Sequence, residues 1–202
     1  MQKVDLYIEK IHSIKNRKAD IEKLIAPYYL EKYHKMKLEK SKLQELLAGY
    51  MLYKYLGVGS DSQIVEDPHH KPFLSSKSQF NLSHSGDYVV LAVSDLPVGV
   101  DIEKKDKIKW PVIRKLFEPA QIEYLQKIEQ ENPKQLQTEF AKLWTGYEAI
   151  IKLRGTGFAE KLSMEEMKSY QHQMQSIELE AFVISCVGEQ ELELNIHSRS
   201  SL

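Results

Sequence analysis

The sequence has little of three things: cysteine, excess charge of one sign, and long apolar runs. Its single cysteine, Cys186, excludes an internal disulfide. Twenty-eight Lys and Arg against 29 Asp and Glu leave a formal net charge of -1, so no overall field would attract nucleic acid or an anionic membrane. No apolar run approaches the roughly 18 residues of a membrane span, and the N-terminus lacks the apolar core of a secretory signal. We therefore expect a cytoplasmic protein that binds neither nucleic acid nor membrane.

Several common catalytic motifs are also missing. The chain has no Gly-x-Ser-x-Gly elbow, no Walker A loop and no GxGxxG fingerprint, which argues against a serine hydrolase, a P-loop NTPase and a dinucleotide-binding enzyme. The pair His69-His70 and the lone Cys186 lack the partners that a structural zinc site needs. Any chemistry must come from other residue types.

The first half of the chain contains helical patterns followed by strand patterns. Alternation predicts a strand at 4–8, and apolar spacing predicts a helix over 43–55 that Gly57 closes, after an earlier helix restarted by Pro27. Strands follow at 80–83, 88–93 and 98–102, with a turn at 84–87, so we expect a β-meander.

The second half repeats this order of elements. We expect a helical stretch over 112–131, a break at Asn132-Pro133, a long helix over 135–154, and strands at 177–187 and 191–197 joined by residues 188–190. Gly49-Tyr50 in the first long helix matches Gly146-Tyr147 in the second. The prediction is an α+β fold of two pseudo-symmetric lobes, 1–96 and 97–202, each a small, mainly antiparallel sheet packed against a long helix, with the active site at their interface.

Two acidic residues alternate on one predicted strand. Asp101 and Glu103 are two positions apart, so their carboxylates share one face, while Val100 and Ile102 point to the other. Magnesium commonly takes one or two carboxylates, waters and substrate phosphate oxygens, so the pair suggests a metal that meets a phosphate ligand. A charged solvent face is the alternative interpretation.

A histidine and two serines form a second candidate. Ser83, His84 and Ser85 lie at the predicted turn before Gly86, where backbone N–H groups and an imidazole could bind an anion. A solvated turn histidine is the alternative.

Charged residues on the last long helix form a third candidate. Glu148 and Lys152 are one turn apart, beside the apolar stripe to which we assign Trp144. They could hold a metal, accept a proton or neutralise phosphate, but they could equally form an ordinary helix-stabilising pair worth roughly 0.2 to 0.5 kcal/mol. The dipeptide Lys71-Pro72 is extended by proline geometry and suits either an ordinary loop or a ligand contact.

The order of these features resembles that of one family, the 4'-phosphopantetheinyl transferase superfamily, in particular its two-lobed, surfactin-synthetase-activating type. The resemblance covers about residues 71 to 155. The matching segments, in chain order, are Lys71-Pro72, Phe80-Asn81-Leu82-Ser83-His84-Ser85, Gly99-Val100-Asp101-Ile102-Glu103, Phe117 with Glu123, and Trp144-Thr145-Gly146-Tyr147-Glu148-Ala149-Ile150-Ile151-Lys152.

The resemblance implies a monomeric, two-lobed enzyme that binds coenzyme A between its lobes. It implies that Asp101, Glu103 and Glu148 hold Mg²⁺, and that Asp101, Glu148 and Lys152 are the catalytic residues. The residues expected to contact coenzyme A are Lys71, Pro72, Ser83, His84 and Lys152. A serine of an apo acyl or peptidyl carrier protein would attack the phosphorus next to the pantetheine, with Glu148 as base, and 3',5'-ADP would leave.

The sequence departs from the family pattern at several positions. Tyr147 stands where the family usually has lysine, and the arginines that the family tends to carry on the first long helix align with Glu45, Tyr50 and Lys54. The residues that could replace those arginines are Lys35, Lys37, Lys40 and Lys42. Two alternatives therefore stay open: a homologue that binds coenzyme A or a carrier protein without turnover, and an interaction protein without a metal.

Overall fold

The computed structural model describes residues 1–66, 72–74, 78–106, 108, 110–157 and 162–198. In the first half, the elements are β1 (Gln2–Lys10), α1 (Lys18–Ile21), α2 (Pro27–Lys35), α3 (Glu39–Leu56), β2 (Ile64–Glu66), β3 (Pro72–Leu74), β4 (Gln79–Ser85) and β5 (Tyr88–Ser94). In the second half, they are β6 (Val98–Lys104), α4 (Trp110–Leu116), α5 (Pro119–Glu131), α6 (Leu136–Arg154), α7 (Met164–Ser169), β7 (Met174–Leu179), β8 (Phe182–Gly188) and β9 (Leu192–Ser198). Within the described residues, no helix is both long enough and apolar enough to cross a membrane.

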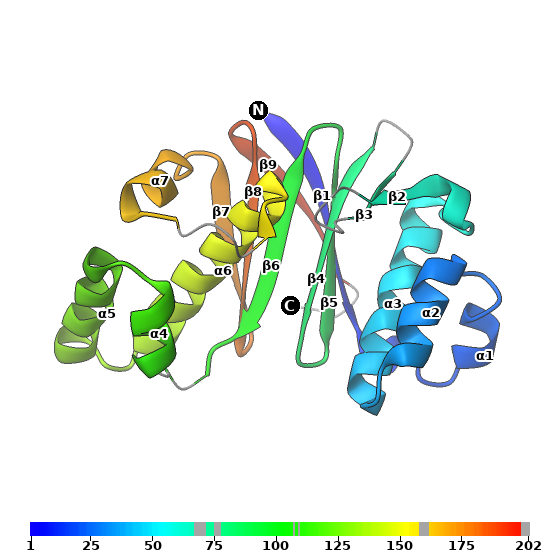
Figure 1. Ribbon diagram of the computed structural model, residues 1–202, viewed down its shortest axis with the longest axis horizontal. Coiled ribbons are helices and arrows are strands. Elements are labelled where there is room, and N and C mark those ends of the chain that lie inside the picture. The colour runs from blue at the N-terminus through cyan, green and yellow to red at the C-terminus, as the bar shows by residue number, and fades with distance from the viewer. Residues whose placement is uncertain (67–71, 75–77, 107, 109, 158–161, 199–202) are drawn as a thin grey trace.

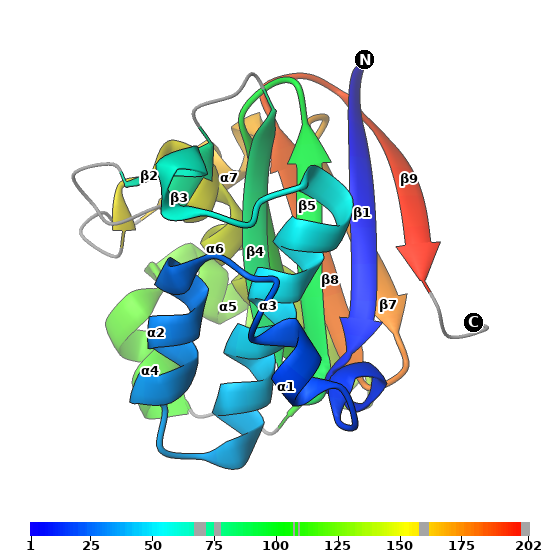
Figure 2. The ribbon, with the colours of Figure 1, turned by 90° about the vertical axis from the view of Figure 1, so that its right-hand side faces the viewer.

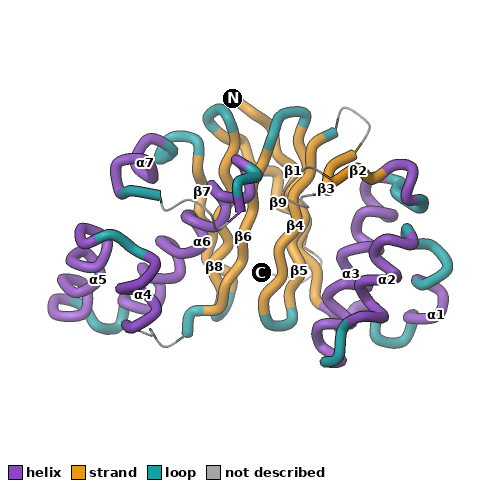
Figure 3. Tube along the Cα trace, in the orientation of Figure 1, coloured by secondary structure: helices purple, strands orange, loops and turns teal. Residues whose placement is uncertain are grey.

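The strands form two main sheets. The first has the order β4-β5-β1-β9 and the second the order β6-β8-β7, while β2 and β3 pair separately. Figures 1 and 3 show the two sheets side by side in the middle of the molecule, with α1 to α3 on one flank and α4 to α7 on the other. The predicted α+β fold of sheets packed against long helices is confirmed.

Three apolar cores hold these layers together, because strands in the middle are buried on both faces. Along β5, Leu91 packs toward the helices of the first flank, whereas Val90 packs between the two sheets. Val100 and Ile184 reach the same middle core from the second sheet. A third core lies between the second sheet and α4 to α7. The continuous apolar run of β5 follows from this double burial.

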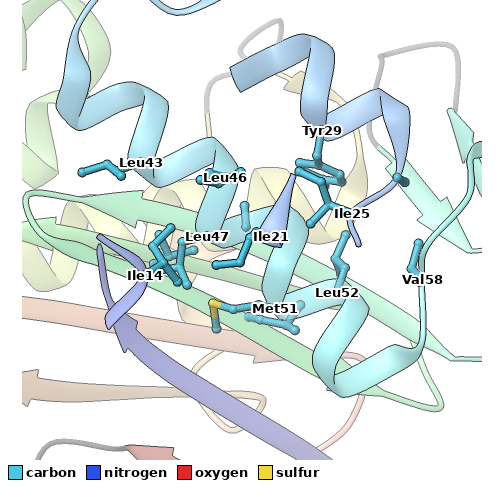
Figure 4. Close-up of a cluster of buried hydrophobic side chains, with 14 of the residues drawn as sticks. Ile14, Ile21, Ile25, Tyr29, Leu43, Leu46, Leu47, Met51, Leu52 and Val58 are labelled. Atoms are coloured by element: carbon cyan, nitrogen blue, oxygen red, sulfur yellow. The ribbon is translucent and has the colours of Figure 1, made fainter. Parts of the chain in front are cut away.

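The core of the first flank is centred on α3. Figure 4 shows side chains from three helices converging there, among them Leu46, Met51 and Tyr29. Gly57 ends α3 in the left-handed conformation with φ of 70°, as the sequence predicts, and Pro27 is the first residue of α2.

The last strand joins the first lobe rather than the second. β9 pairs in parallel with β1, from Gln2 opposite Leu192 to Ile8 opposite Ser198. Figure 2 shows β9 beside β1 at the outer edge of the first sheet. The predicted hairpin between residues 177–187 and 191–197 is therefore wrong. The hairpin is formed by β7 and β8, with a turn at Glu180 (φ of 51°), and β9 belongs to the first sheet. The division into lobes at residues 96 and 97 stays a prediction.

Two other sequence predictions need correction. The β-meander is wrong at its third strand, because β6 pairs with β8 and begins the second sheet. The helical stretch over 112–131 is two helices, because Pro119 starts α5 at its first turn and has no N–H to continue α4. The sequence analysis also missed α7, which Ser163 caps by accepting a hydrogen bond from Glu166 N.

Candidate active site

Side chains join the two sheets where their edge strands, β4 and β6, meet. Alternate residues of β4 point at β6, and each makes one hydrogen bond across the seam. The Val100 N–H donates to Asn81 Oδ1 (2.9 Å), Ser83 Oγ donates to Asp101 Oδ1 (2.7 Å), and Ser85 Oγ donates to Glu103 Oε2 (2.9 Å). Ser83 and Ser85 therefore orient the two carboxylates of β6, while Asn81 binds its backbone.

Gly99 lets β6 approach α6 closely. A Cβ atom at this position would lie 2.0 Å from the Ala149 carbonyl oxygen and 2.7 Å from Leu153 N. Only glycine fits against that helix backbone. The close contact brings Asp101, two residues further along β6, to the face of α6 that carries Glu148 and Lys152.

Lys152 ties α6 to the seam. Its Nζ donates to Asp101 Oδ1 (2.7 Å), to Ser83 Oγ (2.9 Å) and to the Val100 carbonyl (3.2 Å). The Asp101 side chain is 6% exposed and that of Lys152 is 27% exposed, so this ion pair is largely removed from water. Lys152 therefore links α6 to β6.

Glu148 and Glu103 lie in the same environment. Burial raises the pKa of Glu148 to about 7, with a further rise from the charge of Asp101 and an opposing effect of Lys152. Burial also raises the pKa of Glu103, although the hydrogen bond from Ser85 opposes this. Carboxylates that each raise the pKa of a neighbour repel one another, and a bound cation would relieve that repulsion.

One oxygen of Asp101 supports the same interpretation. Among the described residues, Asp101 Oδ2 is buried and accepts no hydrogen bond, and a buried, unsatisfied carboxylate oxygen is costly unless a ligand binds it. Within the same residues, no group of three or more His, Cys, Asp or Glu stands ready to hold a metal by itself. This arrangement fits Mg²⁺, which typically takes one or two carboxylates and completes its shell with water and substrate phosphate.

These residues line one cleft of about 350 Å³ with two walls. β6 and α6 supply the first wall, with Asp101, Glu103, Glu148 and Lys152. α2 and α3 supply the second wall, and β4 lies between the walls with Ser83 and His84. The residues of the second wall are Tyr29, Lys32, Glu45 and Ala48.

The predicted site residues are thus brought together, with some exceptions. His84 lies inside β4 and not in a turn, since the turn is only Gly86-Asp87 and Gly86 adopts φ of 57°. Its Nε2 lies 3.8 Å from Glu45 Oε1. Pro72 begins β3, and Lys71 lies outside the described residues.

Tyr147 does not line the cleft. It is 3% exposed and packs in the third core, where its ring lies 5.7 Å from Phe117 and 6.1 Å from Trp144. A lysine at this position would have to leave that core to reach the cleft. Tyr147, where the sequence departs from the family pattern, is therefore a core residue in this chain. Its lack of a positive charge does not change the lining of the cleft.

Sequence reasoning missed the functions of Asn81, Ser85, Gly99 and Glu45. Ser85 was predicted only as part of an anion-binding turn, and Asn81 and Gly99 appeared only within motifs, although Asn and Ser at alternate positions of a strand are a signal that side chains replace backbone pairing at an edge. Nothing local to the sequence places Glu45 in the cleft, because that depends on how α3 packs against β4.

Comparison with known proteins gives consistent matches. A profile of the 4'-phosphopantetheinyl transferase superfamily matches residues 97–198. The chain is 44% identical over 84 residues to 4'-phosphopantetheinyl transferase psf-1 of Bacillus pumilus, covering 42% of this chain and 35% of that relative. It is 30% identical over 122 residues to 4'-phosphopantetheinyl transferase Sfp of Bacillus subtilis (strain 168), covering 59% of this chain and 53% of that relative.

The aligned segments thus span between about a third and about a half of these relatives' own length. The matched profile covers half of the present chain and includes β6 and α6, the two elements that carry the carboxylates and Lys152. The chain belongs to the 4'-phosphopantetheinyl transferase superfamily.

Proposed function

We propose that this protein transfers the 4'-phosphopantetheine group of a coenzyme A-type donor to a serine of an apo acyl or peptidyl carrier protein. The observation that carries the proposal is the convergence of Asp101, Glu103, Glu148 and Lys152, from β6 and α6, on one cleft between the two sheets. Three carboxylates and a lysine suit a diphosphate that is bound together with a divalent cation. The names of the relatives support this reaction class.

Asp101, Glu103 and Glu148 would hold Mg²⁺. The unsatisfied Oδ2 atom of Asp101 and the raised pKa values of Glu103 and Glu148 support this assignment. Ser83 and Ser85 would keep the β6 carboxylates in position through their hydrogen bonds. Bound Mg²⁺ would neutralise negative charge on the diphosphate oxygens.

Glu148 would act as the general base. The carrier serine Oγ forms a bond to the phosphorus next to the pantetheine, the bond from that phosphorus to the bridging oxygen breaks, and the serine proton moves to Glu148. With coenzyme A as donor, 3',5'-ADP leaves. Lys152 would stabilise the charge that develops on the leaving phosphate.

The test is a transfer assay that uses mass spectrometry of the carrier. The protein is mixed with Mg²⁺, coenzyme A and an apo carrier protein, and the carrier should gain the mass of phosphopantetheine only when all components are present. No mass gain with a range of fatty-acid, polyketide and peptide-synthetase carriers would contradict the proposal. The protein should act as a monomer, and light scattering during the assay checks this.

A second candidate function is binding of coenzyme A or a carrier without turnover. Glu45 favours it, because a carboxylate on the second wall replaces a positive charge expected there. Nucleotide binding with no mass gain on any carrier would support this alternative.

A further inference from the structure

A row of hydroxyl groups connects the second sheet to α6. Ser176 Oγ and Ser185 Oγ lie 2.8 Å apart, Ser185 Oγ and Thr145 Oγ1 lie 2.6 Å apart, and Thr145 Oγ1 lies 2.8 Å from the Ala141 carbonyl oxygen. Ser185 and Thr145 are both fully buried, whereas Ser176 is exposed on β7. Three side-chain hydroxyls therefore form one continuous chain of hydrogen bonds from the surface of β7 to the buried face of α6.

The direction of these hydrogen bonds follows from the acceptors. Thr145 has one hydroxyl proton, which it donates to carbonyl groups of its own helix, at 2.8 Å to Ala141 and 3.4 Å to Lys142. It must then accept its other hydrogen bond from Ser185, and Ser185 in turn accepts one from Ser176. Hydrogen bonds that run head to tail in a buried environment strengthen one another. The bond from Ser185 to Thr145 is thus a defined link between β8 and α6.

Each end of this link is close to a carboxylate of the candidate site. Ser185 pairs with Asp101 across β8 and β6, and directly opposite residues of an antiparallel pair point to the same face of the sheet. Thr145 precedes Glu148 by three positions on α6, so the two side chains lie on the same side of that helix. The hydroxyl link therefore joins the helix of Glu148 to the strand partner of Asp101.

Glu148 lies between two ties that hold α6 on the second sheet. One turn after Glu148, Lys152 donates to Asp101 Oδ1 (2.7 Å) and ties the helix to β6. One turn before Glu148, Thr145 accepts from Ser185 and ties the helix to β8. Sliding or rotation of α6 against the sheet would have to break one of these ties. Together they fix where the Glu148 carboxylate lies relative to that of Asp101.

We infer that Thr145 and Ser185 are positioning residues, whose hydrogen bond sets the separation of the Glu148 and Asp101 carboxylates so that both can bind one divalent cation. The inference rests on the metal site of the proposed function. Neither residue belongs to the described lining of the cleft, so each acts through the backbone that carries a carboxylate. Groups that hold a metal ligand in place change the metal affinity by about 10- to 100-fold when they are lost.

The test is binding of Mn²⁺, followed by the electron paramagnetic resonance signal of the free ion. Ser185→Ala removes the link and leaves Thr145 bonded to its own helix, and Thr145→Val removes the link from the other side. Each should raise the Mn²⁺ dissociation constant about tenfold, whereas Thr145→Ser, which keeps a hydroxyl, should stay within about threefold of the wild type. Ser176→Ala is the matched control, because it removes the exposed end of the chain and keeps the link, and it should leave the constant unchanged.

The double variant, Thr145→Val with Ser185→Ala, separates positioning from packing. Replacing both partners of a buried hydrogen bond by apolar groups of similar shape is nearly neutral for stability, so its urea unfolding should be close to that of the wild type. Its Mn²⁺ affinity should still fall as far as that of either single variant, because all three variants break the same link.

Several results would overturn the inference. They are wild-type Mn²⁺ affinity in the Thr145 and Ser185 variants, an equal loss in Ser176→Ala, no recovery in Thr145→Ser, an unfolded double variant, and no Mn²⁺ binding by the wild type. The double variant decides the matter if a single variant does not fold.

The transfer assay tests the proposed function separately. Weaker Mn²⁺ binding in the Thr145 and Ser185 variants, with no carrier modification by the wild type, would discard the transferase and keep the two positioning residues. Carrier modification by the wild type, with unchanged Mn²⁺ constants in these variants, would do the reverse.

Discussion

The two halves of the molecule each set a long helix near a strand, but only β6 and α6 carry the carboxylates of the proposed site. Beside β1 and α3 lies a second cleft, lined by Tyr7, Lys54, Tyr55 and His197. The two halves can be aligned by matching Val4-Asp5-Leu6 to Val100-Asp101-Ile102 and Gly49-Tyr50 to Gly146-Tyr147. This alignment assigns a counterpart in the first half to each residue of the proposed site. Tyr7 then corresponds to Glu103, Met51 to Glu148 and Tyr55 to Lys152.

The second cleft carries stacked aromatic rings where the first carries carboxylates. The rings of Tyr7 and Tyr55 stack at 3.8 Å and those of Tyr7 and His197 at 4.6 Å, while Met51 is fully buried in the core. Asp5, the counterpart of Asp101, bonds to His197 at 2.9 Å. At the three aligned positions, Tyr7, Met51 and Tyr55 stand where the proposed site has Glu103, Glu148 and Lys152.

Removing the carboxylate of Glu148 or Asp101 from the first cleft should abolish carrier modification. We expect Glu148→Gln and Asp101→Ala each to lower carrier modification by about a thousandfold or more, because a metal ligand or base is lost. Mass spectrometry of the carrier measures this. Asp5→Asn, the corresponding change in the second cleft, should leave transfer intact. Loss of cooperative unfolding in the first two variants would instead indicate a structural role.

Adding one methyl group at Gly99 should separate β6 from α6. We expect Gly99→Ala to lower the free energy of unfolding by about 3 kcal/mol, since the Cβ atom would overlap the helix backbone. Gly57→Ala is the matched control: its φ is 70° but its Cβ would meet no atom within 4 Å, so about 1 kcal/mol is expected. Lys3, which corresponds to Gly99, is exposed on β1. Urea unfolding compares the variants, and equal losses would contradict the close contact.

Removing one hydroxyl at the seam should weaken the first cleft without unfolding it. We expect Ser85→Ala to raise the Mg²⁺ concentration needed for half-maximal transfer by about tenfold, because Glu103 loses its hydrogen bond. Ser85→Thr keeps a hydroxyl and should restore most of the affinity. An unchanged Mg²⁺ requirement in Ser85→Ala would show that Glu103 needs no such support.

The two clefts should also differ in how they make stability depend on pH. The folded pKa of Glu148 is about 7, above its ordinary value of 4.5, so between these values the folded protein keeps a proton that the unfolded chain has released. Stability should therefore fall as pH rises through this window and level off above about 7, by roughly 3 kcal/mol. Glu148→Gln should lack this contribution, and Glu139→Gln on the same helix should retain it. Thermal unfolding without divalent cations, from pH 5 to 8, measures the difference.

The sequence predicted periodic features better than spatial ones. The helices α3 and α6 follow from apolar spacing, and Gly57 predicts the end of α3. The shared face of Asp101 and Glu103 follows from strand alternation. The partners of β6 and β9 could not be predicted, because a strand pattern does not specify which edge it joins, and both strands cross to sheets that local rules did not suggest.

The same limit applies to the site. Glu148 and Lys152 have the spacing of an ordinary helix pair, and nothing in that spacing predicts that the approach of β6 at Gly99 gives Lys152 a partner in Asp101. The location of Glu45 depends on the packing of α2 and α3 against β4, which no local pattern encodes.

The seam between β4 and β6 has a consequence for how this architecture can change over time. A backbone ladder has a fixed spacing and is indifferent to residue type, whereas a junction made of asparagine and serine side chains can be lengthened, shortened or rotated by single substitutions. The distance between β4 and β6 therefore depends on which side chains stand at the seam. In related proteins, single substitutions at Asn81, Ser83 or Ser85 could change the separation of β4 and β6 while the strand pairing within each sheet is kept.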